Sequence, residues 1–161
     1  MTFLSATRTL ALIGALSAMF VTTSLAQTAP SELGTWRLNV AKATFTPGPA
    51  PKASSVTFSA AGQGISAVID GVGPDNAKVR WEYTANFDGK SYPVKGNPDG
   101  DMVVAKRVNT NTIESSYTLK GKPTLVVTRV LSADGKTLTV TQTGMNGQGQ
   151  KVNNVLVFER S

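Results

Sequence analysis

Arg129 is the residue whose type and surroundings most strongly suggest a binding role in this chain of 161 residues. It lies in a mostly apolar run, Leu125 to Leu131, and in a strand it would share one face with leucine and valine side chains. A guanidinium that faces an apolar interior is costly unless it is paired, and its planar fork suits bidentate contact with a carboxylate or phosphate. Arg129 is therefore a candidate anchor for an acidic ligand. Two alternatives stay open: an outward arginine whose stem covers apolar surface, and a structural pair with Glu114.

Aromatic side chains supply the other candidate ligand contacts. In the run from Lys78 to Asp88, Trp81, Tyr83 and Phe87 fall on one face of a strand, and charged or polar residues fall on the other. Aromatic side chains belong mostly to protein cores, so we favour a core position for these three, with the lining of a cavity as the alternative. Tyr117 lies in a second alternating run, and its hydroxyl could reach a ligand.

The absence of histidine and cysteine excludes several kinds of site. Thiol nucleophiles, Ser-His-Asp triads, disulfides and zinc sites built on Cys or His cannot occur in this chain. The oxygen-rich segment Asn97 to Asp101 lacks the late glutamate of a calcium loop, so we interpret it as a turn. No two carboxylates show a spacing typical of acid–base catalysis. We therefore expect no catalytic residue, no metal and no cofactor.

The N-terminal residues 1–26 have the pattern of a secretory signal peptide. Arg8 precedes an uncharged run rich in leucine and alanine, which ends with small residues at Ser24 and Ala26. The apolar stretch is shorter than the roughly 20 residues of a membrane span, so we expect cleavage after Ala26 and no transmembrane segment in the mature protein. The protein is then expected in the periplasm or outside the cell.

Positive charge exceeds negative charge, with 16 Lys and Arg against 10 Asp and Glu and a formal net charge of +6. The bases are scattered, and the local clusters are limited to Lys106-Arg107 and the pair Lys120 and Lys122. A nucleic-acid-binding protein would show a basic stripe with interleaved aromatic residues. We therefore expect no nucleic-acid partner.

Short runs with a period of two dominate the chain after the leader, residues 27–33, and turn dipeptides such as Asp134-Gly135 separate them. Helical periodicity is almost absent. We expect about eight to ten strands, at Thr35–Val40, Ser55–Ala60, Gly64–Val72, Lys78–Asp88, Ser91–Val94, Met102–Val108, Thr112–Leu119, Thr124–Leu131, Thr137–Thr141 and Val152–Arg160.

These elements predict an all-β fold, an antiparallel up-and-down β-barrel formed by residues 34–161 and preceded by the signal helix. Short uniform connections favour a meander, and closure of that meander would remove its two exposed edges. An immunoglobulin-like sandwich is the alternative. The stretch Ala41–Lys52 contains three prolines, which predicts a stiff extended loop and no helical lid.

The opening Gly34-Thr35-Trp36-Arg37-Leu38 resembles the Gly-x-Trp start of the lipocalin and fatty-acid-binding-protein superfamily, the calycins. The resemblance implies that Trp36 closes one end of the barrel and that a late arginine, Arg160, packs over it. The segment from Val127 to Thr141 is similar to the penultimate hairpin of fatty-acid-binding proteins, which implies that Arg129 holds a ligand carboxylate. The chain also resembles secreted bacterial proteins of lipocalin-like type.

Two features depart from the fatty-acid-binding pattern. Leu156 and Phe158 stand where that family has an arginine and a tyrosine, and Ala41–Lys52 replaces its helical lid. A barrel of about eight strands can enclose one small ligand. We therefore expect a binding protein for a small apolar or amphipathic molecule. The alternatives are an enzyme on the same barrel, with Glu114 and Tyr117 as its candidates, and a filled barrel that binds a protein partner.

Overall fold

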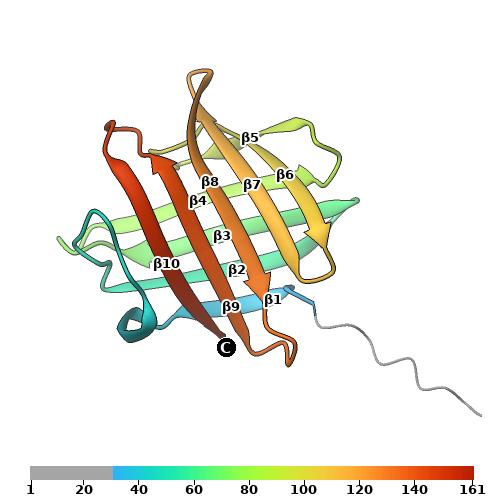
Figure 1. Cartoon of the computed structure of the whole chain (residues 1–161), viewed down its shortest axis with the longest axis horizontal. Coiled ribbons are helices and arrows are strands. Elements are labelled where there is room, and N and C mark those ends of the chain that lie inside the picture. Colours follow the sequence, from blue (N-terminus) through green and yellow to red (C-terminus); the bar gives the residue numbers. More distant parts are fainter. Residues whose placement is uncertain (1–30) are drawn as a thin grey trace, which may run out of the picture.

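Ten antiparallel strands form a closed barrel in residues 31–161, the part of the chain that the computed structural model describes (Figure 1). This confirms the predicted all-β, up-and-down barrel. The predicted signal segment and residues 27–30 of the leader lie outside the described residues. The strands are β1 (Gly34–Leu38), β2 (Ala53–Ala61), β3 (Gly64–Val72), β4 (Lys78–Asn86), β5 (Ser91–Lys95), β6 (Met102–Asn109), β7 (Thr112–Leu119), β8 (Lys122–Leu131), β9 (Thr137–Met145) and β10 (Lys151–Arg160).

Each strand pairs with its neighbours in the sequence, and β1 closes the barrel by pairing with β10. Trp36 lies opposite Arg160 across this last pair. In Figure 1, β7 to β10 pass in front of β2 to β4 at a steep angle, so the two walls enclose the interior between them. Closure pairs the two strands that would otherwise be the exposed edges of the meander. The architecture is compatible with a lipocalin-like fold.

The side-chain alternation located all ten strands, and six of them are longer than predicted, with β9 extended the most. β3 and β7 have the predicted limits, whereas β8 already starts at Lys122 and β9 continues to Met145. Pro123 concealed the start of β8, because proline is rare in strands except near their first residues. Gly144 concealed the end of β9, because it adopts a positive φ of 129° that breaks the alternation.

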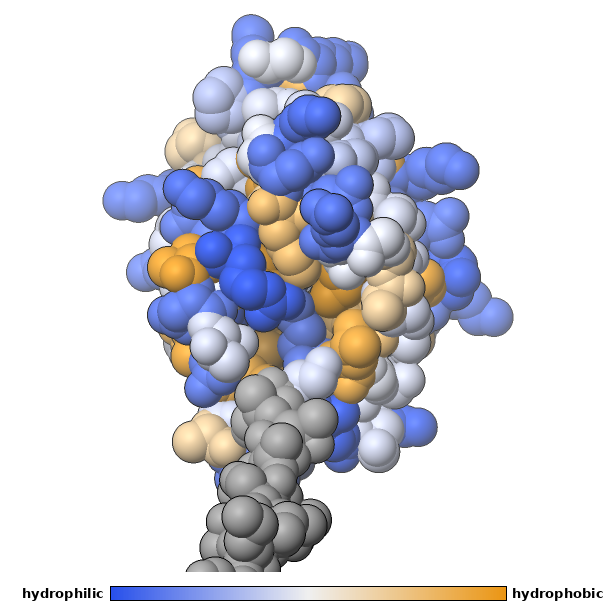
Figure 2. Space-filling model, turned by 90° about the vertical axis from the view of Figure 1, so that its right-hand side faces the viewer, coloured by the Kyte–Doolittle hydropathy of each residue, from blue (hydrophilic) through white to orange (hydrophobic). Residues whose placement is uncertain are grey.

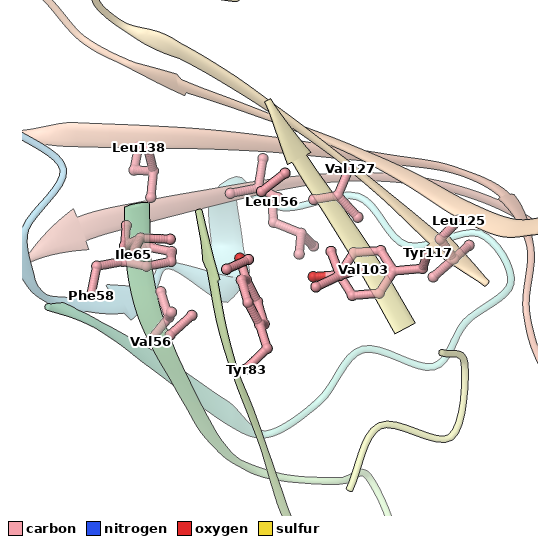
Figure 3. Close-up of a cluster of buried hydrophobic side chains, with 14 of the residues drawn as sticks. Val56, Phe58, Ile65, Tyr83, Val103, Tyr117, Leu125, Val127, Leu138 and Leu156 are labelled. Atoms are coloured by element: carbon pink, nitrogen blue, oxygen red, sulfur yellow. The ribbon is translucent and has the colours of Figure 1, made fainter. Parts of the chain in front are cut away.

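Alternate residues of the strands face the inside and form the core. In β8, Leu125, Val127 and Leu131 are buried, whereas Val126 and Val130 are exposed. Figure 3 shows interior side chains of both walls, with Ile65 and Leu138 at one end of the cluster and Tyr117 and Leu125 at the other. Each aliphatic side chain buried in this way contributes about 1.5–3 kcal/mol to folding, so the core stabilises the barrel without any cysteine.

The connection from β1 to β2 lies along β10. It starts with a single 3-10 turn at Val40–Lys42, and the backbone N–H of Thr44 donates to the carbonyl of Val155 at 2.8 Å. No helical lid occurs in residues 31–161, as predicted from the three prolines. None of the helical structure in this range is long and apolar enough to cross a membrane.

The up-and-down order sends alternate loops to opposite ends of the barrel. We call one end the closed end: it carries the first described residues, Ser31 to Leu33, and the β8–β9 hairpin, because Arg160 donates hydrogen bonds both to the Ser31 carbonyl and to the Gly135 carbonyl. We call the other end the mouth. It carries the β1–β2 loop, the β5–β6 loop and the β9–β10 hairpin.

Candidate functional site

Trp36 and Arg160 lie together at the closed end, and Trp36 is fully buried. The indole Nε1 donates to the carbonyl of Glu32 at 2.8 Å, and the Arg160 guanidinium lies 4.3 Å from the centre of the indole ring. Arg160 also donates to the carbonyls of Leu33 and Ser31 at 2.8 and 2.6 Å. Gly34 has a positive φ of 116° beside Arg160, which explains the glycine of the opening motif. The structure thus brings together the two residues that the calycin resemblance paired.

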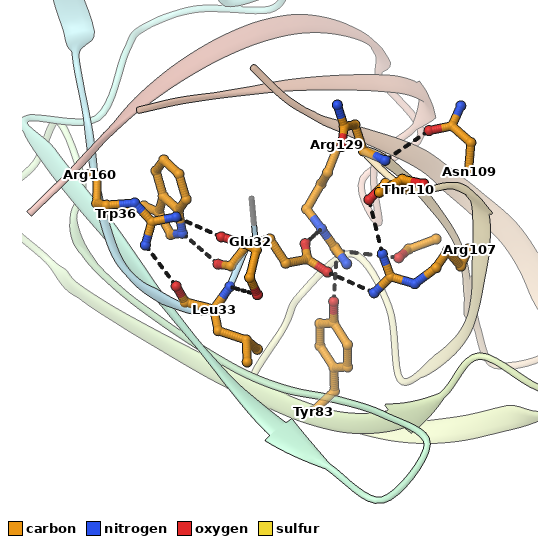
Figure 4. A network of polar contacts seen from close by, with 12 residues as sticks. Glu32, Leu33, Trp36, Tyr83, Arg107, Asn109, Thr110, Arg129 and Arg160 are labelled. Atoms are coloured by element: carbon orange, nitrogen blue, oxygen red, sulfur yellow. Dashed lines mark hydrogen bonds and ion pairs between the residues drawn. The ribbon is translucent and has the colours of Figure 1, made fainter. Parts of the chain in front are cut away.

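Arg129 points into the barrel and is buried, with 4% of its surface exposed. Its Nε lies 3.2 Å from Glu32 Oε2, and its Nη1 donates to the hydroxyl oxygens of Tyr83 at 2.9 Å and Ser115 at 3.4 Å (Figure 4). The guanidinium carbon lies 4.9 Å from the centre of the Phe58 ring, and Nη2 has no hydrogen-bond partner among the described residues. Arg129 is therefore an inward, charged group that is already engaged by an internal carboxylate.

Glu32 is the partner that sequence reasoning missed. It belongs to the leader, and only 8% of its surface is exposed. Besides Arg129 it faces Arg107, whose Nη2 lies 3.8 Å from Glu32 Oε1. The sequence signal was weak, since Glu32 is a lone acid before the barrel and lies in no alternating run.

The predicted alternative, a pair between Arg129 and Glu114, is wrong. Glu114 is exposed, because the buried residues on either side of it, Ile113 and Ser115, occupy the inward positions of β7. The register places Ile113 opposite Arg129 and Glu114 opposite Thr128. The carboxylate considered for an enzyme therefore lies on the outer face of the barrel.

Charge is retained on the buried arginine. Burial by itself would lower the pKa of the Arg129 guanidinium, but the electrostatic influence of Tyr83 and Glu32 outweighs burial and raises that pKa. An arginine is protonated at every accessible pH in any case. The interior therefore holds a permanent cation at Arg129, and the net charge of the interior depends on the acidic groups that face this guanidinium.

Trp81, Tyr83 and Tyr117 form an aromatic cluster in the interior. The rings of Trp81 and Tyr83 are stacked at a centroid distance of 6.2 Å, and Tyr117 meets both of them edge-on at 6.2 and 6.3 Å. Burial raises the pKa of the Tyr117 hydroxyl well above its usual value of 10, and Tyr83 adds to this effect. Tyr117 is therefore a neutral hydroxyl that can donate or accept a hydrogen bond.

This cluster lines a cavity of about 230 Å³ inside the barrel. Arg129 contributes to the same wall, whereas Phe87 does not; Phe87 packs under the guanidinium of Arg107 at 4.6 Å. Four of the sequence candidates are thus gathered around one space, and the fifth is outside it. The other lining side chains are mostly aliphatic or aromatic: Phe45, Pro51, Ser54, Val56, Phe58, Ile69, Val127, Val140, Gln142, Leu156 and Phe158.

The cavity continues toward the mouth into an outer pocket of about 370 Å³, since Trp81, Tyr117, Val127 and Gln142 line both spaces. Side-chain amides surround the outer pocket, and several of them pair with each other. Asn154 donates to Gln142 at 3.0 Å, for example. The polar part of this site consists mainly of uncharged groups.

A third hollow, of about 500 Å³, lies at the closed end beside Glu32 and Arg107. Its floor consists of Ile113, Leu131 and Leu138. Figure 2 shows that end of the molecule, where apolar surface lies sunk between hydrophilic side chains next to the start of the described chain. Arg129 does not line this hollow, so the two spaces approach the ion pair from different sides.

No cluster of three or more metal-ligating side chains occurs in residues 31–161. The Asn97–Asp101 segment is a turn, in which the Asn97 side chain accepts a hydrogen bond from the Asp99 N–H at 2.9 Å. Comparisons of the chain with protein-family models, with curated proteins and with solved structures found no match.

Proposed function

We propose that this protein binds a small apolar or amphipathic molecule inside its barrel. The observation that carries the proposal is the cavity of about 230 Å³, which aromatic and aliphatic side chains line and which continues to the mouth. Ligand sites in proteins are typically concave and largely apolar, with a few polar groups that fix orientation. The polar groups here are Arg129, the hydroxyls of Tyr83, Tyr117 and Ser54, and the amide of Gln142.

The size of the two spaces suggests how the ligand would lie. The inner cavity is smaller than the roughly 300–1,000 Å³ of ordinary ligand sites, so it suits a short apolar segment. The outer pocket would then hold the polar end, in contact with Trp81 and the amide side chains. An amphipathic molecule with a compact apolar part fits this division best.

The compartment and the family are part of the same proposal. The signal-peptide pattern of residues 1–26 supports a periplasmic or secreted protein. The Gly-Thr-Trp opening, the stacked Arg160 and the closed meander support membership of the lipocalin-like barrels. A binding protein in that compartment would hold an apolar molecule away from water.

Two adjacent valines in β8 provide a matched test. Val127 faces inward and lines both spaces, whereas Val126 faces outward and is 40% exposed. We expect the neutral probe N-phenyl-1-naphthylamine to bind the wild type with saturable fluorescence enhancement. Val127→Phe should abolish that enhancement by filling the cavity, and Val126→Phe should preserve it.

The two variants must both remain folded for this comparison. Overpacking a core costs about 1–3 kcal/mol, so the melting temperature of Val127→Phe is measured alongside binding. Absence of saturable binding to the wild type, or equal binding to the two variants, would contradict a ligand site inside the barrel.

A further inference from the structure

The space that the proposed ligand would occupy contains few charges. Among the described residues, Arg129 is the one charged side chain that lines the inner cavity, and Asp99 is the one that lines the outer pocket. The remaining polar groups are hydroxyls and amides. The electrostatic potential inside the site therefore depends on whether a nearby negative charge neutralises the positive charge of Arg129.

Glu32 compensates Arg129 from the closed end. The Glu32 carboxylate lies 3.2 Å from the Arg129 Nε, and it does not belong to the lining of the inner cavity. Figure 4 shows it between Arg129 and Arg107, on the path of the leader segment. The backbone of Glu32 is fixed as well, because its carbonyl accepts the hydrogen bond from the Trp36 indole.

We propose that Glu32 determines the specificity of the barrel: by neutralising Arg129 from behind, it makes the cavity select uncharged amphipathic molecules over carboxylates. This inference rests on the proposed function, because it concerns the ligand of the same cavity. It differs from the expectation raised by the fatty-acid-binding resemblance, in which the arginine holds a ligand carboxylate.

A carboxylate has no favourable position in this site. In the inner cavity it would compete with Glu32 for the Arg129 guanidinium, which Glu32 already holds at 3.2 Å. A Glu32 carboxylate displaced from Arg129 would keep only the longer contact of 3.8 Å to the half-exposed Arg107, so one of the two buried anions would lose its close partner. In the outer pocket it would meet Asp99 and amides, with no lysine or arginine among the described lining residues. An alcohol avoids both penalties, since its hydroxyl can bond to Tyr117 or to an amide.

The test compares two ligands that differ in charge and share one chain length, octan-1-ol and octanoate, at about pH 8, where the carboxylate is ionised. Each ligand displaces N-phenyl-1-naphthylamine from the wild type and from Glu32→Gln. We expect the wild type to bind octan-1-ol about tenfold or more tightly than octanoate, as the cost of an unpaired buried charge implies. Glu32→Gln should lose this preference or reverse it.

Three further variants make the result specific. Glu114→Gln removes one negative charge from the outer face and should keep the wild-type preference. Glu32→Gln combined with Arg129→Met should again reject octanoate, because the cation is gone. If Glu32→Gln fails to fold, Glu32→Asp takes its place, since its shorter side chain withdraws the carboxylate from Arg129 and should give an intermediate preference.

Each outcome decides a different claim. If the wild type binds neither ligand and no probe, the proposed function is wrong and this inference falls with it. If the wild type binds the probe and octan-1-ol but binds octanoate equally well or better, the inference alone is overturned. An unchanged preference in both Glu32→Gln and Glu32→Asp would also overturn it.

Discussion

Tyr117 shows how the interior controls the chemistry of a single residue. Burial raises the pKa of its hydroxyl well above 10, so the folded protein keeps Tyr117 protonated when the unfolded chain has already ionised it. Above pH 10 the unfolded state therefore binds fewer protons than the folded state. The free energy of unfolding then decreases as the pH rises further.

This relation gives a prediction about alkaline stability. Between the unfolded pKa of about 10 and the raised folded value, the Tyr117 contribution falls by up to about 1.4 kcal/mol per pH unit. Tyr117→Phe should remove that part of the loss, which is measured by urea unfolding at several pH values above 10. Tyr92→Phe leaves Tyr117 in place, so its free energy of unfolding should decrease with pH as steeply as that of the wild type. If the free energy of unfolding decreased equally steeply with pH in the wild type, Tyr117→Phe and Tyr92→Phe, a buried neutral Tyr117 would be contradicted.

At the residue scale, the sequence indicated which side chains share a face with Arg129, but it left open whether Arg129 points inward and did not identify its partner. The period of two placed it on the face of Leu125, Val127 and Leu131, and that face is indeed buried. Glu32 is 97 positions away and lies in a segment without periodicity, so no local pattern relates the two residues. Only the closure of the barrel brings the leader beneath β8.

At the scale of strands, Gly144 explains why the predicted end of β9 came too early. Gly144 has a φ of 129°, and a Cβ there would collide with the carbonyl of Thr124 in β8. The strand continues through this position because glycine allows both the backbone angle and the close approach of β8. The other strands begin and end within two residues of their predicted limits.

Gly144→Ala should therefore destabilise the barrel. The unfavourable backbone angle alone costs about 1–3 kcal/mol, and the collision with Thr124 adds to that cost. Gly48→Ala serves as the control, because a Cβ there meets no atom within 4 Å. Thermal or urea unfolding of the two variants checks the difference. Equal stability of the two would mean that β8 and β9 do not approach as closely as described.

At the scale of the whole molecule, the barrel has two ends with different roles. The closed end is held by Trp36, Arg160 and the leader through hydrogen bonds and a cation–π contact. The mouth is bordered by loops and amide side chains, and the cavity extends toward it. The sequence predicted the number of strands and their closure, since these follow from alternation and short turns. It did not predict the cavity, because an unfilled volume depends on how side chains from all walls meet.

The two tryptophans provide the most direct measurement of where a ligand binds. Trp81 lines both the cavity and the outer pocket, whereas Trp36 is fully buried at the closed end. In a titration of ¹⁵N-labelled protein with octan-1-ol, the indole N–H signal of Trp81 should shift progressively to saturation while that of Trp36 stays in place. A Trp81 signal that does not move, or a shift confined to Trp36, would contradict a ligand site that opens at the mouth of the barrel.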